Sequence, residues 1–377
     1  MKIPFNKPFI VGKELFYISQ AVLSGKLAGN GPFSKKCSDF LKQKFEFKEI
    51  FMTTSGTSAL EMAALLCDLK PGDEVILPSF TFVSTANAFY IHGASLKFVD
   101  IDKKTLNMSI ESVKAAITEK TKVIVPVHYA GVGCEMDEIM KLASEKNIIV
   151  VEDAAHAINS KFKNRNLGSF GHFSALSFHE TKNFISGEGG ALIINDEKYF
   201  ERASIVWEKG TNRKAFYEGL VDKYTWVDVG SSFYPSELIT SFLYGQFMEF
   251  EKIMNKRKSL WNYYWSNLIE LQNQDKIRLP VIPSMCEHNA HMFYILTNTH
   301  DERSKLLNLF HENNIGAVFH FIPLHSSPMG KKMGYADGDF PCTEDISKRI
   351  IRLPLFHELE NNEQDLVISV INNFFRR

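Results

Sequence analysis

Long apolar runs are missing from this chain. No stretch long enough to cross a membrane is free of charged residues, whereas a transmembrane helix needs about 20 mostly apolar residues. The first residues, Met1-Lys-Ile-Pro-Phe-Asn6, contain no basic segment followed by an apolar run, which is the pattern of a signal peptide. We therefore expect a cytoplasmic protein without a membrane partner.

The chain has few cysteines, and its positive and negative charges nearly balance. The five cysteines are scattered and form no C-x-x-C pair, which argues against a zinc site and favours reduced structural thiols. With 43 basic and 44 acidic residues the formal net charge is -1, so we do not expect the basic surface of a nucleic-acid-binding protein. Neither a metal nor a nucleic acid is expected as a partner.

Two common nucleotide-binding motifs are also absent. No G-x-G-x-x-G follows an early strand, because neither Gly131-Val-Gly133 nor Gly187-Glu-Gly189 completes one, and no G-x-x-x-x-G-K-[ST] occurs. These absences argue against a nicotinamide-dependent dehydrogenase and against a P-loop nucleotide hydrolase.

The first two thirds of the chain alternate short apolar runs with helical patterns. We predict strands and helices in turn, with strands at 50–54, 74–78, 96–100, 123–127 and 148–151 and helices at 81–92 and 136–145. Such alternation indicates an α/β fold with a mostly parallel sheet that is covered on both faces. Since 377 residues are many for one core, we predict a large domain over residues 1–245 and a second, smaller one.

The pattern changes after Gly210. A long helical pattern from Ser236 to about Leu268, with Pro235 at its start, would join the two domains. The remainder mixes strand and helix patterns, with strands predicted at 292–296 and 317–321 and helices at 303–313 and 363–375. We therefore predict a small α+β C-terminal domain over residues 246–377.

Ligands of an α/β sheet bind at the carboxyl ends of its strands. Thr54-Ser-Gly-Thr-Ser58 lies between a predicted strand and a helix, and the unpaired N–H groups of a helix N-terminus suit a phosphate. Gly56 would allow a close approach and Thr57 would add a hydroxyl, although a simple N-cap is the alternative. Phe82, after the next strand, would either stack on a flat cofactor or belong to the core.

Two further segments fit pyridoxal 5'-phosphate (PLP). Asp153 follows the strand 148–151, where a carboxylate would keep the pyridine nitrogen protonated. His156 would lie near the ring oxygen, or be a structural histidine. Lys182 follows a short strand in Ser177-Phe-His-Glu-Thr-Lys-Asn183 and would form the Schiff base and then act as acid and base. The 29 residues from Asp153 to Lys182 (182 minus 153) leave room for one more strand, so that both would reach one ring.

Taken in this order, these segments resemble the DegT/StrS family of sugar aminotransferases over nearly the whole chain. Further likeness lies in Lys209-Gly-Thr-Asn-Arg213, Val221-Asp-Lys-Tyr-Thr-Trp226, Asn289-Ala-His-Met-Phe-Tyr294 and His320-Phe-Ile-Pro-Leu-His325. The resemblance implies the PLP-dependent transferase fold type I, similar to aspartate aminotransferase, with PLP as cofactor. It implies that Lys182 forms the Schiff base with PLP, that Asp153 pairs with the ring nitrogen and that His156 lies near the ring oxygen. It also implies that Phe82 stacks on the ring and that the phosphate is contacted by Gly56, Thr57 and Ser177.

One segment departs from the family pattern. The family often has Gly-x-Asn-aromatic-Arg where it reaches the cofactor phosphate of the neighbouring subunit, and here Gly230-Ser-Ser-Phe-Tyr234 has Ser232 in the Asn position and Tyr234 in the Arg position. A serine still donates to phosphate, so the resemblance implies a homodimer with shared active sites, while the departure weakens the case for this contact. His320 lies in a segment that the family places near the sugar; an ordinary strand residue is the alternative.

The resemblance also implies the substrates. The amino group of L-glutamate would pass to C4 of dTDP-4-keto-6-deoxyglucose, giving the 4-amino-4,6-dideoxygalactose nucleotide and 2-oxoglutarate for surface-polysaccharide synthesis. The gluco isomer, a 3-amino sugar and a GDP-linked product stay open, as does a non-catalytic PLP-binding regulator. A family dehydratase, in which histidine replaces the lysine, is disfavoured by Lys182.

Overall fold

The main sheet of the computed structural model, which describes residues 2–376, has seven strands in the order β1-β9-β8-β5-β4-β2-β3. Its strands are β1 Glu49–Thr53, β2 Glu74–Pro78, β3 Ser95–Val99, β4 Thr121–Ile124, β5 Ile149–Asp153, β8 Phe173–Ser177 and β9 Gly190–Ile194. The neighbours from β3 to β8 pair in parallel, and only β9 runs antiparallel, to β1 and β8. The prediction of a mostly parallel α/β sheet is confirmed.

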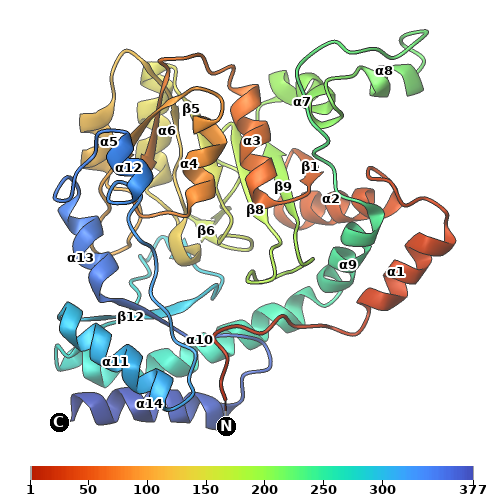
Figure 1. Ribbon diagram of the computed structural model, residues 1–377. Helices are drawn as coiled ribbons and strands as arrows, with labels where there is room; N and C mark the ends of the chain where they lie inside the picture. Colours follow the sequence, from red (N-terminus) through yellow and green to blue (C-terminus); the bar gives the residue numbers. More distant parts are fainter. Residues whose placement is uncertain (1, 377) are drawn as a thin grey trace.

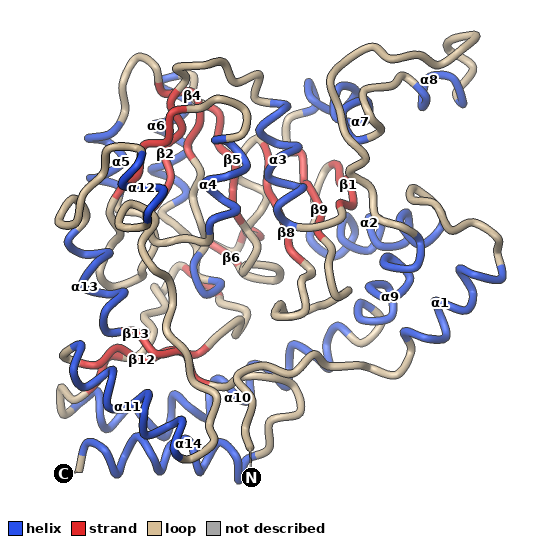
Figure 2. Tube along the Cα trace, in the orientation of Figure 1, coloured by secondary structure: helices blue, strands red, loops and turns tan. Residues whose placement is uncertain are grey.

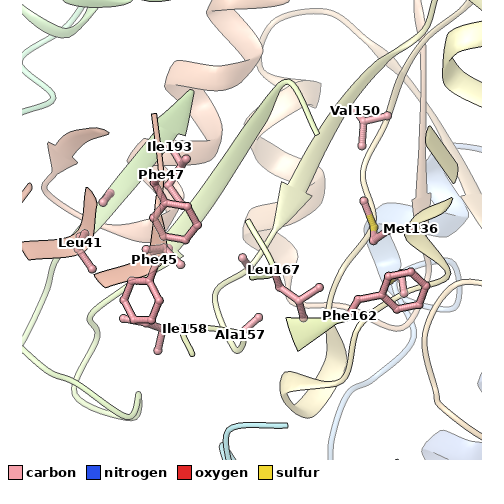
Figure 3. Packing of buried hydrophobic residues seen from close by; sticks show 14 of the residues in the cluster. Leu41, Phe45, Phe47, Met136, Val150, Ala157, Ile158, Phe162, Leu167 and Ile193 are labelled. Carbon is pink, nitrogen blue, oxygen red and sulfur yellow. The ribbon is translucent and has the colours of Figure 1, made fainter. Parts of the chain in front are cut away.

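Helices cover both faces of this sheet (Figure 1). Since alternate residues of a strand point to opposite faces, Ile50 and Met52 of β1 pack on one side and Phe51 on the other. The first face packs against α2 Pro32–Phe45, α5 Ile110–Ala116, α6 Met136–Lys146 and α9 Glu237–Phe247, and the second against α3 Gly56–Leu66, α4 Val83–Tyr90 and α7 Phe200–Trp207. Figure 3 shows part of the first cluster, including Leu41 and Phe45 of α2.

The predicted single helix from Ser236 to Leu268 is wrong, because two helices occupy this range. α9 ends at Phe247, α10 covers Phe250–Asn273, and Glu249 between them has non-helical dihedral angles of -112° and 25°. Figure 1 shows the two helices running in different directions. α9 packs on α1 Glu14–Leu23 and α2, whereas α10 packs on elements of the small domain. Apolar periodicity indicates a helix but does not reveal a bend that two separate packing partners impose.

The small domain is built on a three-stranded sheet, β10-β12-β13. Its elements are β10 Ile277–Arg278, β12 Phe293–Thr297, β13 Ile350–Leu353, α11 His300–Glu312, α13 Pro341–Arg349 and α14 Asn361–Phe375. Figure 2 shows this sheet between the large domain and the helices α11 and α14. The start of the chain also joins this domain, where Ile3 pairs with Ile315.

The strand predicted at 317–321 is wrong. Only Val318 pairs, in an isolated bridge with Arg352 of β13. The chain then leaves the sheet for the large domain, where the N–H of Leu324 donates to the carbonyl of Ser79 (2.9 Å). The apolar pattern of this segment therefore reflects contacts with the large domain and not a sheet ladder.

The remaining strands and α-helices are short. They are β6 Lys161–Phe162, β7 Arg165–Asn166 and β11 Cys286–Glu287, which form a second small sheet, with α8 Arg213–Tyr217 and α12 Pro328–Lys332. Within residues 2–376, none of the helices has the length and apolar character needed to span a membrane. The domain division predicted after residue 245 falls in the last turn of α9 and stays a prediction.

Candidate active site

The carboxyl ends of β5 and β8 bring Asp153 and Lys182 to one place. The two strands are parallel neighbours, with Asp153 paired to Ala175. β8 ends at Ser177, and the chain turns back so that the N–H of Ser186 donates to the carbonyl of Phe178 (2.8 Å). Lys182 lies in this turn. Burial lowers the pKa of Lys182 to about 8, while the charge of Asp153 acts in the opposite direction.

The carboxylate of Asp153 is buried, with 6% of its surface exposed. Its Oδ2 accepts a hydrogen bond from the hydroxyl of Thr85 (2.7 Å), and its Oδ1 accepts one from the N–H of Ala155 (3.1 Å). The hydroxyl of Thr81 lies 2.9 Å from that of Thr85 and extends this chain. Two hydrogen bonds leave lone pairs of the carboxylate available to a ligand.

The N-terminus of α3 packs directly against the end of β8. A Cβ atom at Gly56 would lie only 2.9 Å from the Cβ of Ser177, so glycine permits this contact. Ser55 caps the helix by accepting the N–H of Ser58 (3.0 Å). The N–H groups of Gly56 and Thr57 belong to the first turn, which has no acceptors within the helix. This end of α3 is suited to a phosphate placed beside Ser177.

Three histidines lie beside Lys182. The ring of His156 stacks on that of His291 (centroids 4.3 Å apart), and His291 Nδ1 lies 3.0 Å from Oδ1 of Asn183. His320 hydrogen-bonds the hydroxyl of Tyr129 (2.9 Å) and lies 6.3 Å from His156.

Burial disfavours the charged form of all three rings. Burial is the main cause that holds the pKa of His156, His291 and His320 well below the usual histidine value. Nδ1 of His156 is shielded from solvent and has no partner in the described residues, so it is free to bond a ligand atom.

Phe82 and Ser232 do not join this cluster within the chain. Phe82 is 59% exposed at the start of α4, with its ring 6.4 Å from that of Phe321. Ser232 is exposed as well. The carbonyl of the next residue, Phe233, accepts a hydrogen bond from the N–H of Thr54 (2.9 Å). The structure thus brings together seven of the nine predicted site residues: Lys182, Asp153, His156, Gly56, Thr57, Ser177 and His320.

Sequence reasoning missed several residues of the site. Thr85 stood within the segment that supplied Phe82, and its spacing of four from Thr81 at a helix start was an unused signal. Asn183 directly follows Lys182. His291 lies in the segment Asn289–Tyr294 that resembles the family, so the sequence did hold a signal for it. Tyr129 had no such signal, because it reaches the site only through the fold.

The residues present fit PLP. A buried carboxylate suits a protonated pyridine nitrogen, a helix N-terminus suits a phosphate, and a lysine of lowered pKa suits an aldehyde. The unpaired Nδ1 of His156 adds a donor or acceptor for the ring oxygen. Together with the α/β fold, this set of groups defines the site of a PLP-dependent enzyme.

Comparison with known proteins gives the family. The chain belongs to the DegT/DnrJ/EryC1/StrS aminotransferase family, which matches residues 10–372. GDP-perosamine synthase of Escherichia coli O157:H7 is 31% identical over 99% of this chain and 98% of its own. The spore coat polysaccharide biosynthesis protein SpsC of Bacillus subtilis is also 31% identical, over 99% of this chain and 97% of its own.

A solved structure shows the same fold. Spr1654 of Streptococcus pneumoniae, in its PMP form, superposes with a TM-score of 0.92 at 25% identity and covers 99% of both chains. The predicted family, the transferase fold and the PLP cofactor are therefore confirmed. The protein is a PLP-dependent sugar aminotransferase.

Proposed function

We propose that the protein transfers the amino group of L-glutamate to C4 of dTDP-4-keto-6-deoxyglucose, and so acts as a dTDP-4-amino-4,6-dideoxygalactose transaminase of surface-polysaccharide synthesis in the cytoplasm. The observation that carries the chemistry is Lys182, an amine of lowered pKa beside a buried carboxylate. The choice of sugar rests on five segments that resemble that enzyme: Ser177–Asn183, Lys209–Arg213, Val221–Trp226, Asn289–Tyr294 and His320–His325.

Lys182 would move the proton in both halves of the reaction. When bound, PLP supplies a ring that accepts the electron pair released as a proton leaves the carbon beside the amine. Lys182 removes that proton from the donor and later delivers one to C4 of the sugar. A pKa of about 8 leaves part of the amine unprotonated near neutral pH, which suits this exchange.

The other residues would hold and orient the cofactor and the sugar. Asp153, kept in place by Thr85, would face the ring nitrogen, and His156 would bond the ring oxygen. The N–H groups of Gly56 and Thr57 and the hydroxyl of Ser177 would bind the phosphate, and Phe82, exposed at the start of α4, would cover the ring. His320, fixed by Tyr129, contacts the sugar.

A homodimer would complete the site. Large apolar side chains are exposed on α1 and on the segment after α7, among them Leu15 (78%), Leu23 (85%), Tyr217 (70%) and Trp226 (79%). A surface with several exposed large apolar side chains favours a protein interface. We propose that a second copy covers it, and that Ser232, exposed in each chain, reaches the cofactor phosphate of the partner.

A GDP-linked sugar is the second candidate, because a relative with 31% identity is named GDP-perosamine synthase. The test offers the PLP-loaded enzyme and L-glutamate either dTDP-4-keto-6-deoxyglucose or a GDP-linked 4-keto-6-deoxy sugar. We expect an amino sugar from the first only, with the small proton couplings at C4 that an axial amine gives. Large couplings would point to the gluco product, and reaction of the GDP sugar alone would reject the dTDP substrate. PLP binding without amino exchange would instead support a regulator.

A further inference from the structure

Arg352 is a cation of the site that lacks an acidic partner. In the described part of the chain, no hydrogen bond or ion pair reaches its guanidinium group, and its Nε is shielded from solvent. Two other arginines differ: Arg257 donates to the carbonyl of Ala290 (3.2 Å), and Arg213 pairs with Glu208 (3.0 Å). A shielded donor without an acceptor is costly, so an anion that accepts from this Nε would stabilise Arg352 in place.

Strand alternation directs Arg352 toward the large domain. Its neighbours on β13, Ile351 and Leu353, pack into the small-domain core. Arg352 lies across from Tyr294 of β12, whose ring is 6.0 Å from that of Tyr129 in the large domain. Since residues opposite each other in a sheet share a face, Arg352 lies on the side of the active site.

The charge of Arg352 acts on the groups of the active site. Beyond the effect of burial, the charge of Arg352 lowers the pKa of Lys182, His156 and His320, so all three lie within its field. Phe5 packs its ring 4.7 Å from the guanidinium carbon, which orients the group without neutralising it. The N–H edges of the guanidinium stay available to an anion.

We propose that Arg352 binds the α-carboxylate of the amino donor. This inference rests on the proposed function. The donor must bring its amino nitrogen to the position of the Lys182 amine, and its α-carboxylate lies only two bonds from that nitrogen. The diphosphate of a nucleotide sugar is separated from the reacting C4 by the sugar ring. An arginine that shares a site with Lys182 therefore matches the donor carboxylate and not the diphosphate.

The test separates the two half-reactions. Arg352→Met and Arg352→Lys proteins are loaded with PLP, and the loss of visible absorption is followed against L-glutamate concentration. The pyridoxamine-phosphate forms are then mixed with the keto sugar. Binding of glutarate, which has no amino group, is measured by calorimetry as a readout independent of turnover. Arg278→Met is the control, since Arg278 also has an unpartnered nitrogen and lies on the same sheet face, through its pair with Leu296.

We expect Arg352→Met to weaken glutamate and glutarate binding on the order of 100-fold, the loss of two charge-assisted hydrogen bonds. Arg352→Lys should be intermediate, because lysine makes no bidentate contact. The keto-sugar half-reaction and the Arg278→Met protein should be unchanged. Loss in the sugar half-reaction with normal glutamate binding would assign Arg352 to the diphosphate and overturn the inference, as would no change in either. Wild-type protein that binds glutarate but exchanges no amino group would contradict the proposed function. In that case, the comparison of glutarate binding between the wild type and the Arg352 variants would still show whether Arg352 binds a carboxylate.

Discussion

At the scale of single residues, the site depends on how Lys182 is kept reactive. Its pKa is the outcome of burial, which disfavours the charged amine, and of Asp153, which favours it. Both residues were predicted from the sequence, because each follows a strand and polar residues at strand ends meet at one edge of a parallel sheet. Thr85 and Arg352 were not predicted in the site, since their contacts depend on how α4 and β13 lie in space.

The pKa of Lys182 gives a prediction of pH dependence. PLP-free protein should combine with PLP at a rate that rises as the pH increases through about 8, because only the unprotonated amine attacks an aldehyde. Asp153→Asn removes the carboxylate that raises this pKa, so its midpoint should move to lower pH. The appearance of visible absorption measures the rate, and Lys182→Ala is the control without a reactive amine. A midpoint near 10.5, the ordinary value, would contradict the prediction.

The hydrogen bond from Thr85 to Asp153 (2.7 Å) gives a second prediction. Thr85→Val keeps the shape of the side chain and removes a donor to a charged group, which is worth about 1.5–3 kcal/mol. We expect kcat to fall about tenfold to 100-fold. Thr81→Val is the matched control, because its hydroxyl reaches Asp153 only through Thr85. Equal effects of the two substitutions would show that Thr85 does not act through Asp153.

At the scale of elements, periodicity predicted most strands and helices but not their partners. The apolar residues of β1 and β2 alternate between two cores, and their continuous apolar runs in the sequence predict burial on both faces. The bend between α9 and α10 and the loss of the strand at 317–321 were not predictable, because each results from contacts with a second domain.

Helix α2 gives a stability prediction at this scale. The buried Glu237 of α9 accepts the N–H groups of Gly31, Phe33 and Ser34 (3.0, 2.6 and 3.0 Å), and so closes the N-terminus of α2. Glu237→Ala leaves these donors without the carboxylate, and we expect the free energy of unfolding to fall by about 3 kcal/mol. Urea unfolding of the PLP-free protein measures the change.

The control for this substitution is Glu251→Ala. Glu251 pairs with Lys44, and its side chain is 71% exposed. An exposed ion pair contributes about 0–1 kcal/mol, so this variant should unfold nearly as the wild type does. A similar loss in both variants would show that Glu237 has no special role at α2.

At the scale of the whole molecule, the resemblance of the sequence to one family predicted the fold and the cofactor, while the packing of the small domain on the site had to come from the structure.

We predict a homodimer in sedimentation, and Leu23→Glu with Trp226→Glu should shift it toward monomers because both side chains are exposed and apolar. The monomers should bind PLP more weakly, since the partner's Ser232 no longer reaches the phosphate. A wild-type monomer with full activity would reject shared sites.

One experiment tests the central claim most directly. The visible spectrum of the PLP-loaded protein is recorded, L-glutamate is added, and dTDP-4-keto-6-deoxyglucose follows in the same cuvette. We predict that glutamate removes the yellow absorption and that the keto sugar restores it, because the amino group enters the cofactor from one substrate and leaves on the other. A protein whose absorption glutamate does not change would contradict the account, and absorption that glutamate removes but this sugar does not restore would reject the proposed substrate.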